Sequence, residues 1–127
     1  MEREGYYKKL FFVGALWNWG ATVPLFFFYG FIFTLLGEKV PVFPVWLQLF
    51  LALAFVFGIG YYWVSKDLSR VEIVKMGAIG KILVFIIPLY YAIRGDIGWI
   101  VVGIVFVDLV FAVLFIEFLL RVRKSVA

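Results

Sequence analysis

Hydrophobic positions in this chain gather into four long runs that are separated by short polar segments. The runs cover residues 10–36, 45–64, 76–93 and 97–120. A helix needs ~20 predominantly apolar residues to cross the hydrocarbon core of a bilayer, and each run is close to or above that length. The pattern predicts an all-α integral membrane protein, an up-down four-helix bundle formed by one domain over residues 1–127.

The first run is longer than one membrane span requires. It contains Gly20, Pro24 and Gly30, and proline within a helix removes a backbone hydrogen bond and bends the helix. We therefore expect a kink. Either the helix tilts or projects beyond the membrane, or its last part, residues 31–36, lies along the membrane interface. The run also exceeds the ~7–15 apolar residues of a signal-peptide core, so we interpret it as a retained helix.

The start of the third helix carries a capping signal. Ser69, Arg70, Val71 and Glu72 match the capping-box pattern, in which a Ser at the N-cap and a Glu three residues later satisfy free backbone N–H groups. This pattern predicts that the helix begins at Ser69.

Lysine and arginine are distributed unevenly between the two ends of the predicted helices. Only Lys39 and Arg94 fall at one end. The opposite end holds Arg3, Lys8, Lys9, Lys66, Arg70, Lys75, Arg121, Arg123 and Lys124. Because cytoplasmic loops carry an excess of positive residues, both termini are predicted to be cytoplasmic, in a multi-pass protein of the inner or plasma membrane.

Composition removes several classes of function. Hydrophobic residues make up 66% of the chain, and there is no Cys and no His. Disulfides, thiolate chemistry and the commonest metal ligand and neutral-pH base are therefore excluded. No phosphate-loop or dinucleotide motif occurs. The basic residues that give the net charge of +4 lie beside the apolar runs, so we expect no nucleic acid partner. Because the chain lacks these ligands and motifs, we also expect no metal and no cofactor.

Five polar positions interrupt the apolar runs: Asn18, Gln48, Lys81, Asp108 and Glu117. An ionisable residue near the membrane centre costs ~2.5–3.5 kcal/mol on insertion scales, so each needs an explanation. At ~1.5 Å per residue from the cytoplasmic helix ends, Glu117 lies ~6 Å deep, Lys81 ~9 Å, Asn18 ~13 Å and Asp108 ~19 Å. Gln48 lies ~7 Å in from the outer face.

Asp108 is the deepest charge, and Lys81 is its obvious partner. Their depths differ by ~10 Å, and helical side chains lean toward their own N-terminus, which points these two apart. We therefore expect no Lys81–Asp108 pair. Two interpretations of Asp108 stay open: a neutral carboxyl hydrogen-bonded to Gln48 or Asn18, or a site for a proton, a cation or a ligand headgroup.

Lys81 and Glu117 have alternatives of their own. Lys81 either extends to the cytoplasmic interface or pairs with Glu117, and Glu117 pairs either with Lys81 or with Arg121 at i+4. Asp108 and Glu117 are nine residues apart, which places them on opposite faces of one helix. They therefore cannot form an acid/base carboxylate dyad.

Small and polar residues form a stripe on the first helix. Gly14, Asn18 and Thr22 fall at i, i+4 and i+8. Such a stripe is typical of a helix–helix packing face, and its alternative is the lining of a ligand pocket.

A short pattern of residues resembles a known group of proteins. A Gly-x-Gly-Tyr sequence ends the second run, a polar loop carries Asp and Arg, and Gly-x-x-Gly-Lys opens the third run. These residues are Gly58, Gly60, Tyr61, Asp67, Arg70, Gly77, Gly80 and Lys81. The pattern resembles small four-helix membrane proteins of bacteria and archaea of the DoxX-like type. The resemblance implies an association with quinone-linked sulfur oxidation or with membrane complexes, although this chain supplies no residues for a redox centre.

The sequence favours a non-catalytic membrane protein. It would act as a homo-oligomer or as an accessory subunit of a larger membrane complex, surrounded by the lipid bilayer and able to hold a lipid- or quinone-like ligand. One alternative is a proton- or cation-coupled transporter of small solutes that uses Asp108. Another is a membrane enzyme on a lipid-soluble substrate, with Asp108 or Glu117 as acid/base.

Overall fold

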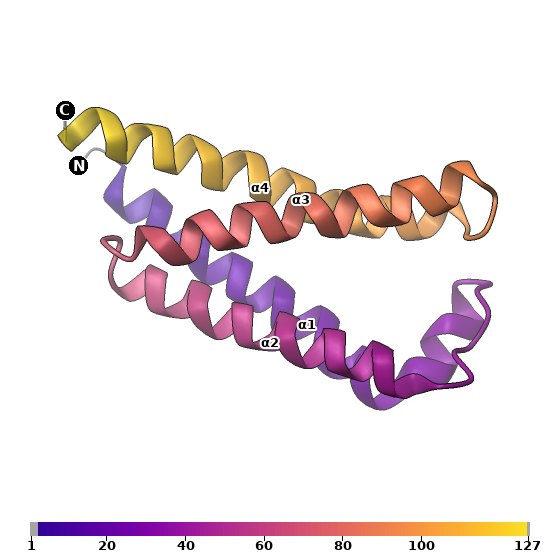
Figure 1. Cartoon of the computed structure of the whole chain (residues 1–127). Coiled ribbons are helices and arrows are strands. Elements are labelled where there is room, and N and C mark those ends of the chain that lie inside the picture. Colours follow the sequence, from indigo (N-terminus) through magenta and orange to yellow (C-terminus); the bar gives the residue numbers. More distant parts are fainter. Residues whose placement is uncertain (1–2, 127) are drawn as a thin grey trace.

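The chain folds into four α-helices joined by short connections (Figure 1). The computed structural model describes residues 3–126, and the side chains up to Lys124. The helices are α1 (Glu4–Leu35), α2 (Pro44–Lys66), α3 (Val71–Ile93) and α4 (Trp99–Val126). Each is long and apolar enough to cross a membrane. The predicted all-helical class and helix number are confirmed for the described residues.

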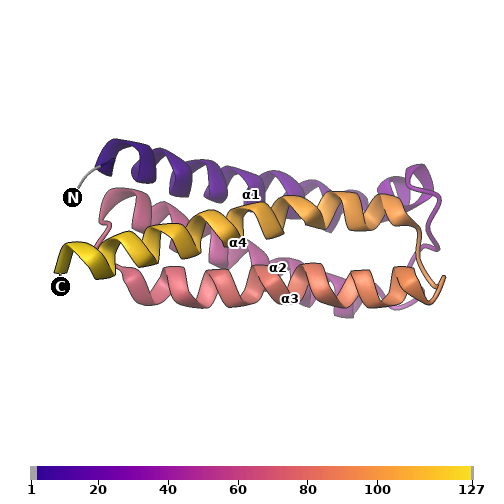
Figure 2. The ribbon, with the colours of Figure 1, turned by 90° about the horizontal axis from the view of Figure 1, so that it is seen from above.

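Successive helices run in opposite directions along a common axis (Figures 1 and 2). Both termini and the α2–α3 loop lie at one end of the bundle, which we call the terminal end (Figure 1). The connections 36–43 and 94–98 lie at the other end, which we call the turn end. The up-down arrangement therefore follows the order of the hydrophobic runs.

Helices extend beyond the hydrophobic runs at the terminal end. α1 begins at Glu4 rather than at residue 10, α3 begins at Val71 rather than at residue 76, and α4 continues to Val126. Lys, Arg and Glu are good helix formers, so the charged segments beside the membrane continue the helices. Hydropathy marks the part of a helix that enters lipid, not the helix itself.

The α2–α3 loop is organised by Asp67 instead of by a capping box. Asp67 Oδ1 accepts hydrogen bonds from the Ser69 hydroxyl at 2.6 Å and from the Ser69 backbone N–H at 3.0 Å. These two bonds, the hydroxyl bond first, lower the pKa of the exposed Asp67 carboxyl, so their contribution is present at neutral pH and is lost as pH falls. With Ser69 held in this turn, α3 begins at Val71, and the predicted start at Ser69 is wrong.

A kink divides α1, as its proline and glycines predict. Phe28 has non-helical backbone angles (φ −124°, ψ 33°), one turn after Pro24. Beyond the kink, the end of α1 turns back toward the α3–α4 hairpin (Figure 1). The bend is confirmed, while the placement of residues 31–36 in or along the membrane stays a prediction.

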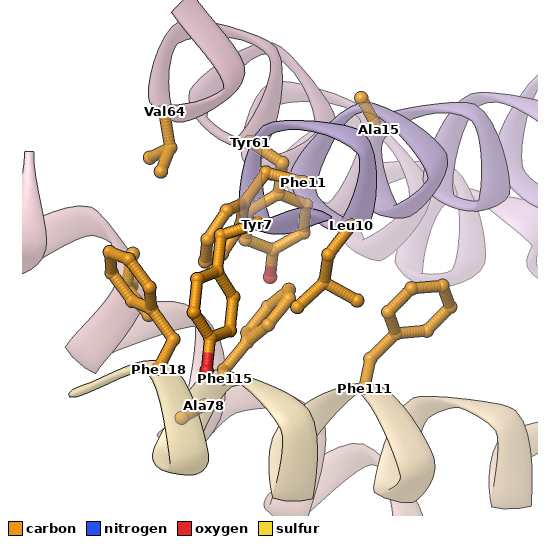
Figure 3. Close-up of a cluster of buried hydrophobic side chains, with 11 residues drawn as sticks. Tyr7, Leu10, Phe11, Ala15, Tyr61, Val64, Ala78, Phe111, Phe115 and Phe118 are labelled. Atoms are coloured by element: carbon orange, nitrogen blue, oxygen red, sulfur yellow. The ribbon is translucent and has the colours of Figure 1, made fainter. Parts of the chain in front are cut away.

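The core shared by the helices is aromatic and lies toward the terminal end. Figure 3 shows side chains from all four helices that point into this cluster. Its members are Tyr7, Leu10, Phe11, Ala15, Tyr61, Val64, Val74, Ala78, Phe111, Phe115 and Phe118. Phe115 lies at its centre, with ring centroids 4.8 Å from Phe11 and 5.1 Å from Tyr61. Toward the turn end the α1–α2 and α3–α4 hairpins diverge (Figure 1).

One hydrogen bond joins the two hairpins at the turn end. Glu38, in the connection after α1, accepts the backbone N–H of Gly98 at 2.6 Å, directly before α4. A carboxylate there satisfies a free N–H and complements the dipole of the helix. A Cβ at Gly98 would lie 2.7 Å from Glu38 Oε1, so a side chain there would displace the carboxylate from its present position. The α1 kink is what directs Glu38 toward the other hairpin.

Removing this contact should loosen the turn end. We expect Glu38→Ala to cost about 1 kcal/mol, as the loss of a helix cap does, and to widen the separation of the hairpins. Because the chain has no Cys, nitroxide labels on Lys39→Cys and Arg94→Cys report this separation by pulsed electron paramagnetic resonance. Glu38→Gln keeps an acceptor oxygen and is the matched control. An unchanged distance distribution in Glu38→Ala would show that the contact does not hold the hairpins.

Candidate functional site

A polar network inside the bundle connects all four helices. Lys81 of α3 is 4% exposed. Its Nζ donates to Asp108 Oδ1 of α4 at 2.7 Å and to Asn18 Oδ1 of α1 at 3.0 Å. Asn18 Nδ2 in turn donates to the backbone carbonyl of Ala54 in α2 at 2.8 Å. We call Asn18, Lys81, Asp108 and the Ala54 carbonyl the polar network.

Small residues allow α1 and α2 to approach closely enough for the Asn18 bond. A Cβ at Gly58 would lie 2.6 Å from Trp19 Nε1 and 3.1 Å from Asn18 Cβ. The missing side chain at Gly58 therefore leaves room for the Asn18 amide beside the carbonyl of Ala54, one turn earlier. Thr22 adds a bond within α1 by donating its hydroxyl to the carbonyl of Asn18 at 2.7 Å. The stripe of Gly14, Asn18 and Thr22 is buried.

Aromatic rings enclose the Lys81 ammonium group. Its Nζ lies 5.3 Å from the ring centroid of Tyr61 and 5.1 Å from that of Phe111, within the range of cation–π attraction. Gly77 makes room for Tyr61, because a Cβ there would lie 2.6 Å from Tyr61 Cε1. Sequence reasoning did not place Tyr61 or Phe111 at this site. The feature of the sequence that could have indicated an aromatic ring here is the i, i+4 spacing of Gly77 and Lys81. This spacing places a position without a side chain next to the lysine on the same helix face.

The expectation that Lys81 and Asp108 stay apart is wrong. Depths measured from the cytoplasmic helix ends are misleading for this pair, because the register of a helical hairpin is set at its connecting turn. Lys81 lies 12 residues before the end of α3 at Ile93, and Asp108 lies nine after the start of α4 at Trp99. From that turn their depths differ by only ~4–5 Å. The long lysine side chain bridges this offset despite the opposite leans.

Other expected partners of these residues are also corrected. Lys81 neither extends to the interface nor pairs with Glu117. In the part of the chain that the structure describes, the Gln48 side chain forms no hydrogen bond, so Gln48 is not the partner of Asp108. Asn18 meets Asp108 only through the shared Lys81 ammonium.

Glu117 belongs to a separate cluster at the terminal end. Its Oε1 accepts from Arg121 Nε at 3.2 Å, the i+4 pair that the spacing predicts. It also accepts from the Tyr7 hydroxyl at 2.9 Å and lies 3.5 Å from Arg3 Nη1. Tyr7 could not be singled out from the sequence, because a tyrosine near a membrane boundary is typical of an interface residue.

The chemistry of the polar network is that of a closed, mutually satisfied set. Among residues 3–124, every fully buried side-chain nitrogen or oxygen has a hydrogen-bond partner. Asp108, 16% exposed at its side chain, already accepts an ammonium N–H. Such a set holds helices together in a medium where an unpaired polar group is costly.

Comparison of the chain with protein-family models, with curated proteins and with solved structures gives no match.

Proposed function

We propose that this chain is a non-catalytic, multi-pass protein of the cell membrane that acts as an oligomer or as an accessory subunit of a larger membrane complex. The main support is the polar network, which directs Asn18, Lys81 and Asp108 toward one another and joins four helices. Removing one member of a buried ion pair costs about 3–5 kcal/mol. The polar groups inside the membrane thus have a structural use.

The charge distribution supports an orientation with both termini in the cytoplasm. The nine basic residues that share one end in the sequence belong to the termini and the α2–α3 region, and these meet at the terminal end (Figure 1). Lys39 and Arg94 belong to the connections at the turn end. By the positive-inside rule, the terminal end faces the cytoplasm.

The exterior of the bundle supports assembly with other helices. No more than 33% of the most apolar stretch of any helix is buried within the chain. Gly20 on α1 and Gly103 on α4 are exposed, and a Cβ at either would meet no atom within 4 Å. Small residues on membrane helices allow a second helix to approach closely. Membership of a complex also agrees with the DoxX-like resemblance, which stays a prediction.

Assembly is tested by native mass spectrometry of the protein released from gently solubilised membranes. We expect a homo-oligomer or a complex with other membrane proteins. Gly103→Leu should reduce the assembled fraction several-fold, because packing at small residues is lost. Val110→Leu, a change between two apolar side chains at another exposed site of α4, should not. A wild-type chain that is only monomeric, without partners, would count against the proposed function.

The transporter and enzyme alternatives gain no specific support. A transporter that uses Asp108 needs this carboxylate to part from Lys81 during each cycle. An enzyme that uses Asp108 or Glu117 as acid/base needs a carboxylate free to exchange a proton, whereas both accept hydrogen bonds from cationic groups.

A further inference from the structure

Three hydrogen-bond donors converge on one carboxylate oxygen at the terminal end. Glu117 Oε1 accepts from Tyr7, Arg121 and Arg3, at 2.9, 3.2 and 3.5 Å. Tyr7 is fully buried, so it fixes the carboxylate against the core. The carboxylate in turn holds two guanidinium groups near each other at the surface.

A shallow cavity of about 250 Å³ lies beside this carboxylate. It is lined by Glu117, Leu120, Arg121 and Lys124 on successive turns of α4. Arg3, Arg121 and Lys124 carry three positive charges and Glu117 one negative charge, which leaves 3 − 1 = +2. We call these four charged residues the basic cluster. An excess of positive charge with guanidinium donors is the chemistry that recognises a phosphate group.

Exposed apolar residues lie both in the cavity and beyond it along the same side of α4. Val113 and Leu120 are 58% and 53% exposed, and they share a helix face with Glu117 and Lys124, at i, i+4, i+7 and i+11 from Val113. A ligand with a phosphate in the cavity and hydrocarbon chains along this face matches both parts. A free phosphate would use only the first.

We propose that the basic cluster binds the phosphate of an anionic phospholipid, with the acyl chains along Val113 and Leu120. The site rests on the membrane placement proposed above, because it needs the terminal end at a membrane surface. It does not depend on assembly. Arg121 and Lys124 contact the phosphate, and Glu117 positions Arg3 and Arg121 around it.

The test is a native mass spectrometry titration with phosphatidylglycerol, and with phosphatidylcholine of the same acyl chains. We expect phosphatidylglycerol to bind more tightly. Each basic residue near an anionic lipid contributes about fivefold in affinity, so Arg121→Gln with Lys124→Gln should weaken phosphatidylglycerol binding roughly 25-fold. Arg70→Gln with Lys75→Gln removes the same charge at the same end, outside the cluster, and should change it little.

Three outcomes would overturn the site. Both lipids carry a phosphate and differ in net headgroup charge, so equal affinity would show no preference for an anionic lipid. Equal weakening in both double variants would show only a general charge effect. Displacement of the lipid by stoichiometric glycerol 3-phosphate would assign the site to a free phosphate compound. The same spectra report assembly: an oligomer without preference for phosphatidylglycerol contradicts only this site, and a monomer that binds it selectively contradicts only the proposed function.

Discussion

Lys81→Met alone should destabilise the bundle by about 3–5 kcal/mol, the range found when one member of a buried ion pair is removed. Asp108 would then lie in the interior of the bundle without its ammonium partner, and the side-chain Oδ1 of Asn18 would lose the hydrogen bond that it accepts from Lys81. Asp108→Leu should have a similar effect, because it leaves the Lys81 ammonium unpaired. The measurement is the stability of each purified variant in detergent, from thermal or denaturant unfolding.

The double variant Lys81→Met with Asp108→Leu separates an ion pair from two independent residues. Apolar groups of similar size can replace a buried pair at little cost, so we expect the double variant to lie much nearer the wild type than either single variant. We expect Asn18 to keep its bond to the Ala54 carbonyl in all three variants, because this bond involves neither Lys81 nor Asp108. If the double variant loses the sum of the two single effects, Lys81 and Asp108 are not coupled.

Gly77→Ala should cost about 1–3 kcal/mol, the usual effect of overpacking a filled core. The added methyl group would lie 2.6 Å from Tyr61 Cε1 and 2.7 Å from its hydroxyl oxygen, and Tyr61 is only 2% exposed. The ring must move, and with it one wall around the Lys81 ammonium. Thermal unfolding gives the loss of stability, and near-ultraviolet circular dichroism reports the altered packing of the aromatic rings.

Gly80→Ala is the matched control for this change. Gly80 lies three residues further along α3, and a Cβ there meets no atom within 4 Å. We expect a stability within about 1 kcal/mol of the wild type, since alanine is the better helix former. Equal effects of the two substitutions would mean that backbone flexibility, not room for Tyr61, determines the role of Gly77.

The fold was largely predictable because the local composition of each apolar run is enough to indicate a helix. Four apolar runs gave four helices, and Pro24 gave the bend near Phe28. The helix ends at the terminal end were less accurate, since charged residues such as Lys8 in α1 and Arg121 in α4 continue a helix beyond its apolar run. The loop before α3 shows a different limit. The Ser69 hydroxyl could either cap the helix or bond to Asp67, and in the structure it donates to Asp67.

The members of the polar network were predictable, but their pairing was not. Asn18, Lys81 and Asp108 stand out because polar residues are rare in apolar runs. Which of these side chains meet depends on how far one helix is displaced along its axis relative to the next. Residue counting gives this displacement only when both counts start from a point that the two helices share. The turn between α3 and α4 is such a point, whereas the helix ends at the terminal end are not.

The ion pair between Lys81 and Asp108 joins α3 to α4 within the polar network, and solid-state nuclear magnetic resonance in lipid bilayers can measure it. The experiment records the dipolar coupling between the ¹⁵N-labelled Lys81 Nζ and the ¹³C-labelled Asp108 carboxyl carbon, together with the carboxyl chemical shift. The structure, with Nζ 2.7 Å from Oδ1, predicts a strong coupling and the shift of an ionised carboxylate. A protonated Asp108 carboxyl without dipolar coupling to Lys81 would contradict the ion pair.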